Sequence, residues 1–430
     1  MVRPSDQDEA HPAISGEIAS EPCEDTVPWN NPLVDFLIVG NGMFGAATAR
    51  YLAPHASVSV IGPPASADGT TGYGAHYDEG RIIGDFSRDA VRSELNRLAR
   101  VGITELDPDL IIRCGVLTAT TSNSADLGVA ARLREEHGTD ISVLTSGEAH
   151  ACFPMAAFDS GEAVLSQPDA GYFSPRRYVA LCLRLARSCG AAVIPGTVQA
   201  LRVSGGGVEA GFEDGRQVRA GAAIVANGAF AAGSQLLPRL VALRARSEIY
   251  AMAEVDEQQA AELAGMPCVK RTIEHPELAD LYVIPPIRYP DGHFYIKAGA
   301  NTTMDQWLTG PAAVRAWYDH GHSDGPLSAL RELVTSLLPG IRVSSWHTRR
   351  CGDAHTAHAM PYIDVLEPGR LIVALGGNGR GARHADAVGQ LTADLALNGE
   401  WQSSLPRDVF RHVPAGSGWT GMPLLWEQRR

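Results

Sequence analysis

The chain has 430 residues, of which 45% are hydrophobic and 20% are charged, as is ordinary for a globular protein of about two or three domains. Its formal net charge of −13 makes nonspecific binding to nucleic acid or to an anionic membrane unfavourable. The seven cysteines are scattered without a CxxC pair, so neither a zinc site nor a disulfide framework is expected.

The first 30 residues are rich in acidic residues, Pro and Ser, and they lack the basic start and apolar core of a signal peptide. We expect a disordered leader over 1–30. The uncharged run 220–238 contains Asn, Gly, Ser and Gln, and it is better interpreted as strand, turn and helix than as a membrane span. We therefore expect a cytoplasmic protein without a membrane or nucleic-acid partner. The sequence does not indicate its oligomeric state.

The first predicted element is a short apolar run, Leu33 to Val39, which is typical of a buried parallel strand. A glycine motif, Gly40-x-Gly42-x-x-Gly45, follows it and leads into good helix formers. Such glycines permit a tight turn, close approach of a pyrophosphate and close helix–strand packing, while the helix N-terminus supplies free N–H groups. This context predicts that a dinucleotide binds at Gly40, Asn41, Gly42, Met43, Phe44 and Gly45.

The second predicted strand, 56–61, ends at Gly62. In a dinucleotide-binding fold this position usually carries an Asp or Glu that binds the adenosine ribose. Because glycine has no side chain, the ribose must be held by another group, for example the backbone.

Helical and strand patterns then alternate up to residue 226, where the apolar strand 222–226 ends at Asn227-Gly228. This is a second strand-to-loop glycine against which a ligand can lie. Asp214-Gly215 is a hairpin turn signal. The other elements predicted here are helices over 89–106, 125–137 and 177–188, and strands over 110–119, 141–145, 192–203 and 207–213.

Residues 240–345 have no glycine-rich phosphate loop and mix strands with amphipathic helical stretches, which indicates a separate, mainly antiparallel module. The strands are predicted over 247–255, 281–287 and 292–299, and the helical stretches over 257–264 and 311–336. A buried strand at 370–375, a glycine-rich turn at 376–381 and a helix at 382–397 then return to the pattern of the first domain.

This arrangement resembles the D-amino-acid oxidase superfamily of flavoproteins, most closely its monomeric sarcosine oxidase and fructosyl amine oxidase branch, over about residues 33–398. The resemblance implies FAD, a two-domain fold and oxidation of a carbon–nitrogen bond. A nicotinamide dehydrogenase would share the first glycine motif but not the late strand, glycine loop and helix. The motifs that carry the resemblance are the first glycine loop, His76 to Ile83, Gly171 to Pro175, Ala226 to Gly228, Lys297 to Gly299, Cys351 to Asp364 and Gly376 to Arg383.

The fold class implied is α/β, with an FAD-binding Rossmann-like domain assembled from separated segments and an α+β substrate domain with a mainly antiparallel sheet. The FAD-binding domain is assigned to 31–110, 171–238 and 346–400. The substrate-binding domain is assigned to 111–170 and 239–345, and residues 401–430 form a C-terminal tail.

Two positions carry reactive chemistry in the resemblance. Cys351 is similar to the cysteine that tethers the flavin through a thioether, and Arg349 and Arg350 can help to lower its thiol pKa. The alternative is a structural buried cysteine. Lys297 stands where the family places the lysine that activates oxygen, because a preorganised cation stabilises the charge of superoxide. The alternative is a lysine on the solvent face of a strand.

The remaining candidates surround the flavin or the substrate. Arg81 matches a family arginine near the flavin, and His76 lies one residue out of step with a family histidine. Arg383 aligns with a basic residue that binds substrate carboxylate, although it can also be a solvated helix charge. The second carboxylate-binding cation of the family falls at Gly84, so we expect poor activity on sarcosine and a larger amine as substrate. Further cofactor contacts are implied at Gly228, Gly376, Gly377, Asn378, Gly379, Arg380 and Gly381, where a helix N-terminus favours anionic reduced flavin.

The function these residues imply is an FAD-dependent oxidase of a small-molecule amine or amino acid, with O2 as electron acceptor and no metal. A neutral amine would give hydride to the flavin, the imine would hydrolyse, and O2 would be reduced to hydrogen peroxide. Two alternatives remain open. One is a flavin dehydrogenase with another electron acceptor, and the other is a catalytically silent flavin-binding subunit of an oligomer.

Overall fold

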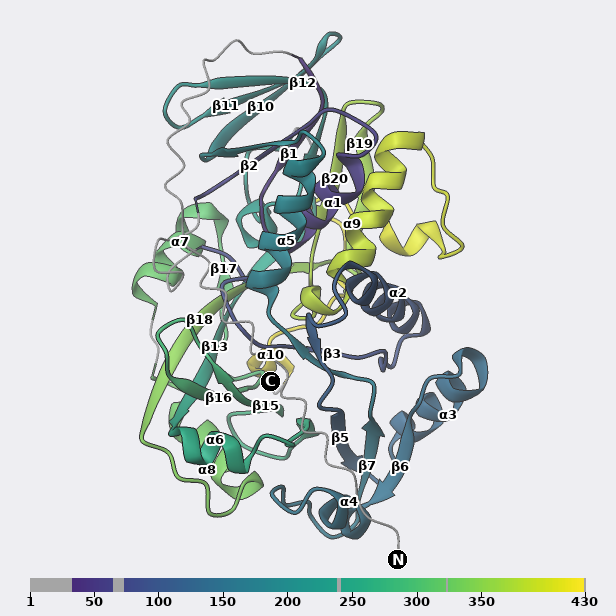
Figure 1. The fold of residues 1–430 in the computed structure, drawn as a ribbon. Helices are drawn as coiled ribbons and strands as arrows, with labels where there is room; N and C mark the ends of the chain where they lie inside the picture. The colour runs from purple at the N-terminus through teal and green to yellow at the C-terminus, as the bar shows by residue number, and fades with distance from the viewer. Residues whose placement is uncertain (1–32, 65–72, 238–240, 322–323, 429–430) are drawn as a thin grey trace, which may run out of the picture. The chain divides into compact units, whose positions relative to one another are not determined.

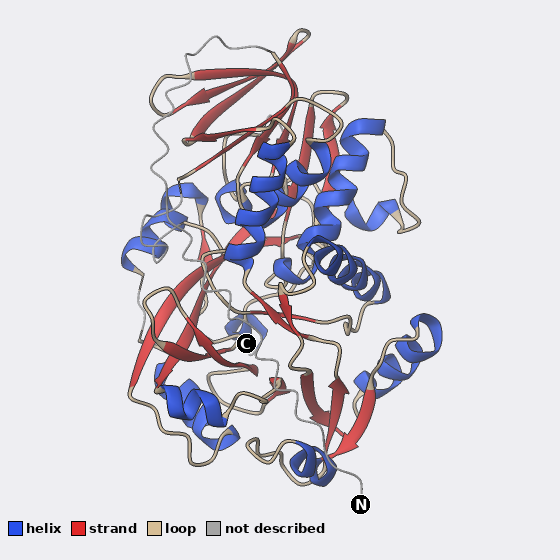
Figure 2. Ribbon diagram, in the orientation of Figure 1, coloured by secondary structure: helices blue, strands red, loops and turns tan. Residues whose placement is uncertain are grey.

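The computed structural model describes residues 33–64, 73–237, 241–321 and 324–428 (Figure 1). The leader expected over 1–30 lies outside these residues. The described part of the chain contains both helices and strands (Figure 2), and no helix in it combines the length and apolar character of a membrane span.

The first large sheet has eight strands, with β1 (Val34–Val39) at its centre. The strand β1 pairs in parallel with β2 (Val58–Gly62) on one side and β12 (Gln217–Val225) on the other. Parallel strands β1 and β2 joined by a helix over residues 43–52 are the mark of a Rossmann-like sheet. The remaining strands are β9 (Ala192–Pro195), β10 (Val198–Ser204), β11 (Gly207–Phe212), β19 (Tyr362–Glu367) and β20 (Leu371–Leu375).

Helices pack against this sheet through small residues. The helix α1 (Met43–Leu52) follows the first glycine loop and buries Ala46, Ala47 and Ala49 completely. A Cβ on Gly389, in α9 (Gly381–Asn398), would overlap the side chain of Ala47, so glycine is what allows α1 and α9 to pack so closely. The helices α2 (Ala90–Leu106) and α5 (Pro175–Ser188) contact α9 and α1, respectively.

The second large sheet has nine strands and is antiparallel except where β14 (Cys268–Thr272) pairs with β5 (Val116–Thr121). Its longest strands, β13 (Leu243–Val255) and β18 (Ser345–Thr356), pair over most of their length. The other strands are β6 (Ser142–Thr145), β7 (Glu162–Gln167), β15 (Asp280–Arg288), β16 (Phe294–Gly299) and β17 (Trp307–Leu308). A small third sheet holds β3 (Arg81–Ile83), β4 (Ile111–Ile112) and β8 (Gly171–Phe173).

The expected fold class is confirmed, with corrections of detail. The helical stretch predicted over 311–336 is two helices, α7 (Gly310–His320) and α8 (Leu327–Leu337), and the strand predicted over 110–119 is split into β4 and β5. The helix expected before residue 238 is only the short 3-10 turn η1 (Gly228–Ala231). Other elements are α3 (Ala125–His137), α4 (Ser146–Cys152), α6 (Glu257–Glu262), η2 (Arg407–Phe410) and α10 (Leu425–Gln428).

The strand β18 bears on the proposed domain boundaries. Residues 346–356, assigned from sequence to the FAD-binding domain, lie in β18 and pair with β13 in the second sheet. The first sheet resumes at β19 and β20. The domain boundaries themselves stay a prediction.

Candidate active site

A cavity of about 1490 Å³ is lined by residues from both large sheets. Pockets for drug-sized ligands usually measure roughly 300–1,000 Å³, so this one has room for a dinucleotide together with a small substrate. The glycine loops at 40–45 and 376–381 lie at the first sheet's side of the lining, and side chains of β13, β14, β15 and β16 provide the other side.

The first glycine loop forms a backbone cradle. Gly40 has a φ of +113°, and a Cβ there would lie 2.5 Å from the carbonyl oxygen of Ala226 on β12's loop. A Cβ on Gly45 would overlap Gly40, whereas a Cβ on Gly42 would point toward His76. Gly42 caps α1 without a side-chain hydrogen bond, so the first N–H groups of α1 remain available to an anion in the cavity.

The end of β2 is filled by a side chain from the loop. A Cβ on Gly62 would overlap the amide of Asn41, whose Nδ2 donates to the carbonyl oxygen of Pro63 at 2.8 Å. Asn41 therefore occupies the place where this fold usually has a carboxylate, and its amide oxygen can accept a hydrogen bond from a ribose hydroxyl. Glycine at position 62 is what makes room for it.

The second glycine loop, 376–381, is fixed by Asn378. This residue has a positive φ of 52°, donates from Nδ2 to the Gly376 carbonyl at 2.7 Å and accepts from the backbone N–H of Thr356 at 2.9 Å. No side chain caps the start of α9, so a second helix N-terminus is open beside the cavity. Asn227 adds a buried Oδ1 without a hydrogen-bond partner among the described residues, next to Gly228 in the lining.

The opposite wall is one face of the second sheet. Tyr282 on β15 pairs with Gly299 on β16, so Lys297, two residues earlier, points to the same side as Tyr282. Tyr250 on β13 also pairs with Gly299 and shares this face. The Lys297 ammonium lies 4.3 Å from the ring centroid of Tyr250, and the lysine is completely buried. It is therefore not a lysine on the solvent face of a strand.

Lys297 forms a buried ion pair with Asp78, from the loop before β3. The same carboxylate pairs with Arg81 and accepts a hydrogen bond from the Tyr289 hydroxyl at 2.7 Å. Although burial opposes it, Asp78 raises the pKa of Arg81 well above its ordinary value. Two cations share one carboxylate, so this group of three carries one net positive charge beside the cavity.

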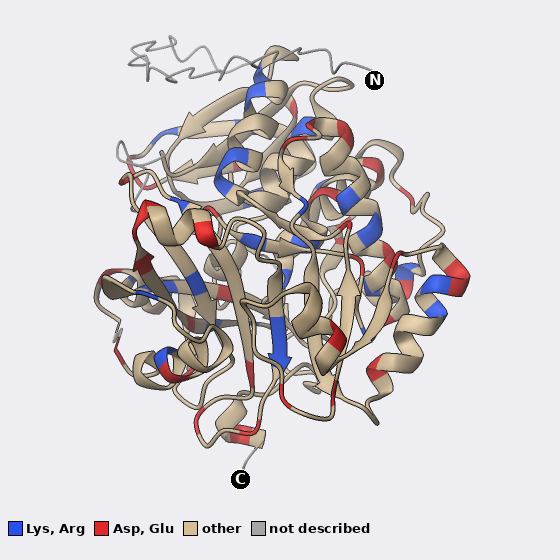
Figure 3. Cartoon of the chain, turned by 60° about the horizontal axis from the view of Figure 1, so that its bottom comes forward, with Lys and Arg blue, Asp and Glu red and all other residues tan. Residues whose placement is uncertain are grey.

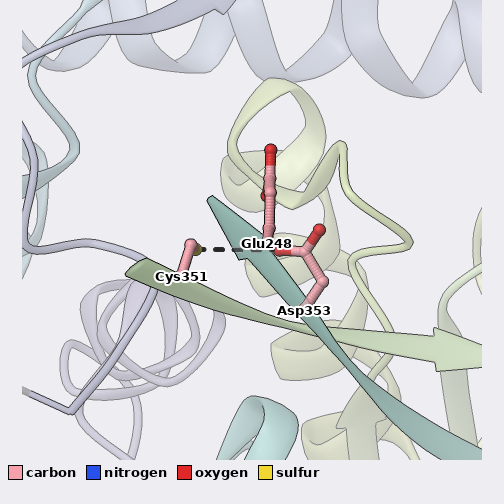
Figure 4. A group of neighbouring side chains, drawn as sticks. All are labelled: Glu248, Cys351 and Asp353. Carbon is pink, nitrogen blue, oxygen red and sulfur yellow. Dashed lines mark hydrogen bonds between the residues drawn. The ribbon is translucent and has the colours of Figure 1, made fainter. Parts of the chain in front are cut away.

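Cys351 lies next to a second charge network on the same face (Figure 4). Glu248 on β13 pairs in register with Cys351 on β18. The Cys351 sulfur and one carboxylate oxygen each of Glu248 and Asp353 all lie within 4.8 Å of one another, close enough to share a metal ion. Arg246 pairs with Asp353 at 3.1 Å, and Arg81 lies 3.8 Å from the Cys351 sulfur. Guanidinium groups on both sides favour an internal network over a metal cation at this cluster.

Protonation within this network differs from residue to residue. Burial, and then the neighbouring Asp353, raises the pKa of Glu248 well above its ordinary value. Burial raises the pKa of Asp353, but Arg246, His355 and other neighbours together bring it below its ordinary value. Burial and Asp353 raise the pKa of the Cys351 thiol. Neither Arg349 nor Arg350, the two arginines expected to lower the pKa of this thiol, makes a contact with it. Arg349 lies 3.7 Å from Asp291, and Arg350 donates to the carbonyl oxygen of Gly321. The guanidinium group beside the Cys351 sulfur is that of Arg81.

The other predicted site residues line the cavity at different places. Burial lowers the pKa of His76 to about 4, so it is a neutral ring, and it lies beside Gly42 in the dinucleotide cradle. Arg383 and Arg380 extend from the start of α9. A Cβ on Gly84 would lie 2.9 Å from the Gln167 amide oxygen and 3.0 Å from the Ala170 Cβ, so no side chain fits there without a shift.

Comparison with known proteins agrees with this geometry. Residues 35–395 match the family described as FAD dependent oxidoreductase, abbreviated DAO. The chain belongs to this FAD-dependent oxidoreductase family. A search among curated protein sequences gives no match.

Several solved structures that are described as amine or amino-acid enzymes share the fold of this FAD-dependent oxidoreductase. It is similar to NikD, described as an unusual amino acid oxidase essential for nikkomycin biosynthesis (TM-score 0.72, 18% identity, 89% of this chain and 98% of that chain). It is also similar to glycine oxidase from Geobacillus kaustophilus (TM-score 0.68, 20% identity, 90% of this chain and 99% of that chain). A third similar structure is amadoriase I, a fructosyl amine: oxygen oxidoreductase from Aspergillus fumigatus (TM-score 0.65, 20% identity, 88% of this chain and 89% of that chain). The expected family and FAD cofactor are thereby confirmed.

The cavity of this FAD-dependent oxidoreductase suits FAD on its own chemistry. Two uncapped helix N-termini suit phosphate and anionic ring oxygens, and the unpartnered oxygen of Asn227 suits a hydroxyl or amide donor. Sequence patterns alone missed Asp78, Glu248, Asp353 and Lys270, because their roles depend on pairing between distant strands. Two usable signals were present, since Asp78 lies within the motif from His76 to Ile83 and Asp353 lies within the motif from Cys351 to Asp364.

Proposed function

We propose that this protein is an FAD-dependent oxidase of an amine or amino acid, which converts the substrate to an imine and reduces O2 to hydrogen peroxide. The observation that carries the proposal is the buried cation Lys297, held by Asp78 on the sheet face that lines the cavity opposite the dinucleotide cradle. Similar folds described as glycine oxidase, iminodiacetate oxidase and fructosyl amine oxidoreductase support an amine substrate.

FAD would lie against the glycine loops at 40–45 and 376–381, with Asn41 at the ribose. When bound, FAD supplies the capacity to accept a hydride from the carbon next to nitrogen and to pass two electrons to O2. The chain's own residues then bind the substrate, set its protonation and hold the cation.

The net positive charge of the group Asp78, Arg81 and Lys297 acts on the substrate amine. A nearby cation disfavours a second positive charge, so it lowers the pKa of a bound ammonium and favours the neutral amine. Only the neutral amine can lose hydride readily, because its nitrogen lone pair stabilises the developing imine. Burial raises the pKa of Tyr250 and Tyr282 well above the ordinary value, so both remain phenols that can donate hydrogen bonds.

The same positive charge suits oxygen reduction. The first electron given to O2 creates an anion, and a cation fixed in place before the reaction stabilises it without reorganisation. Lys297 is fixed by Asp78 and by a hydrogen bond of 3.1 Å from Nζ to the carbonyl oxygen of Gly80.

A panel of amines tests the proposal. Purified holoenzyme is expected to be yellow, and at least one class of primary or secondary amine is expected to bleach the flavin anaerobically and to release peroxide in air. Sarcosine is expected to be a poor substrate, because position 84 offers no cation. Efficient turnover of sarcosine would contradict this substrate preference, and peroxide release from no amine in a broad panel would contradict the oxidase proposal.

Covalent attachment of the flavin at Cys351 is a separate proposal. Attack on the flavin needs a thiolate, and Arg81, 3.8 Å from the sulfur, opposes the effect of burial on the thiol pKa. Acid precipitation is expected to leave a yellow pellet, and Cys351→Ala is expected to release nearly all of the colour. The control is Cys182→Ala, a buried cysteine in α5. A white pellet from the wild-type protein would show that the tether does not form.

A further inference from the structure

The chain uses lysine at only two positions. Of its 36 basic residues, 34 are arginine, and the two lysines are Lys270 and Lys297. Both line the same cavity. Lys297 is accounted for by the proposed reaction with O2, whereas Lys270 has no role in it.

Lys270 projects from the same sheet face as Lys297. It pairs in register with Tyr282 on β15 and with Thr118 on β5, and Tyr282 shares its face with Lys297. The Lys270 ammonium lies 5.6 Å from the ring centroid of Phe86. Within the described residues it has no carboxylate partner at ion-pairing distance.

Two arginines line the same cavity as Lys270. Arg380 and Arg383, at the start of α9, line the same space, and neither forms an ion pair with a carboxylate in the described part of the chain. Burial, followed by Arg383 and Arg380, lowers the pKa of Lys270 well below its ordinary value. Burial, and then Arg380, lowers the pKa of Arg383 to about 10. Each cation therefore repels its neighbours.

Two carboxylates near these cations offset only part of their charge. Asp126 pairs with Arg88, and Asp280 accepts two hydrogen bonds from Asn301, at 2.7 and 2.6 Å, and also acts on Arg380. Arg92 adds another cation to the lining and donates to the carbonyl oxygen of Ala359 at 2.6 Å. Acidic and basic residues are interspersed over the molecule as a whole (Figure 3). The excess of positive charge around Lys270 is therefore a local feature of this cavity.

Cations that outnumber the carboxylates around them repel one another until an anion enters between them. We propose that Lys270, Arg380 and Arg383 form an anion subsite that takes a doubly charged group of the substrate, either a phosphate or a pair of carboxylates. That this anionic group belongs to an amine substrate rests on the proposed function. Binding of an anion at the three cations does not depend on it. Because position 84 cannot hold a cation, the acid group of the substrate lies farther along the sheet, toward Lys270.

Binding of anions that cannot be oxidised tests the subsite directly. The FAD-loaded enzyme is titrated calorimetrically with inorganic phosphate, with glutarate and with butyrate, a singly charged match for glutarate. We expect phosphate or glutarate to bind at least about tenfold more tightly than butyrate, since each charged hydrogen bond contributes about that factor. Tighter binding of phosphate assigns a phosphate group, and tighter binding of glutarate assigns a dicarboxylate.

Lys270→Met removes the charge and keeps the length of the side chain. It is expected to weaken binding of the preferred dianion by about tenfold and to change butyrate binding little. The control is Arg202→Gln, which removes a charge from the exposed strand β10. Equal binding of dianions and butyrate, or an unchanged dianion affinity in Lys270→Met, would overturn the subsite.

A second readout does not depend on a variant. Because the chain has two lysines, reductive methylation followed by peptide mass spectrometry reports on Lys270 separately from Lys297. The preferred dianion is expected to protect Lys270 while butyrate does not, and equal labelling would contradict the subsite. Amine turnover without preferential dianion binding would reject only the subsite, and dianion binding without any amine turnover would reject only the oxidase.

Discussion

Replacing Lys297 by methionine is expected to slow the reaction of the reduced enzyme with O2 by about two orders of magnitude, which corresponds to ~3 kcal/mol of lost charge stabilisation. The ammonium is completely buried and held by Asp78, so no other mobile cation can take its place quickly. Methionine keeps most of the volume. The measurement is stopped-flow absorbance of the flavin after the reduced variant is mixed with O2.

Two comparisons make this result specific. Reduction of the flavin by substrate under anaerobic conditions, measured at a pH high enough for the substrate amine to be neutral without help from Lys297, is expected to stay close to the wild-type rate. Lys270→Met, the same substitution at the other lysine of the same sheet face, is expected to slow the O2 reaction far less. Equal slowing in both variants would mean that general charge, and not the position of Lys297, governs oxygen reactivity.

Asp78→Asn is expected to lower the free energy of unfolding by about 3–5 kcal/mol. Asp78 is completely buried, and its carboxylate neutralises part of the charge of Lys297 and Arg81 and accepts the Tyr289 hydroxyl. Asparagine leaves two buried cations without a counter-charge. Urea unfolding followed by circular dichroism measures the change.

The matched control is Asp291→Asn. Asp291 also accepts a tyrosine hydroxyl, from Tyr295 at 3.2 Å, and faces Arg349 at 3.7 Å, but its side chain is 31% exposed. Its loss is expected to cost less than about 1 kcal/mol, as is usual for exposed ion pairs. An Asp78→Asn protein within about 1 kcal/mol of the wild type would show that the ion-pair group does not stabilise the fold.

Local sequence patterns predicted the parts of the fold that local physics determines. The first strand, glycine loop and helix follow from an apolar run, three closely spaced glycines and good helix formers, and the structure has them at β1 and α1. Gly40 has a positive φ, and a Cβ on Gly45 would overlap the backbone of Gly40. The late strand and helix around Gly376 were predicted for the same reason.

Pairing between distant segments was out of reach of such patterns. Asp78 and Lys297 are 219 positions apart, and only the arrangement of β3 and β16 brings them together. The missing carboxylate at Gly62 was visible in the sequence, but its replacement by Asn41 depends on a side chain folding over the strand end. Lys270 on β14 and the two arginines at the start of α9 are likewise far apart in sequence, and they share one cavity only in the folded chain.

The reaction of the wild-type enzyme with O2 tests the central claim most directly. The holoenzyme is reduced anaerobically with dithionite, freed of excess reductant and mixed with air-saturated buffer, while flavin absorbance and peroxide are followed. An oxidase with Lys297 beside its flavin is predicted to recover its yellow colour within seconds and to form one peroxide per flavin. Colour that returns only slowly in air but at once with an artificial electron acceptor would contradict the oxidase and identify a dehydrogenase.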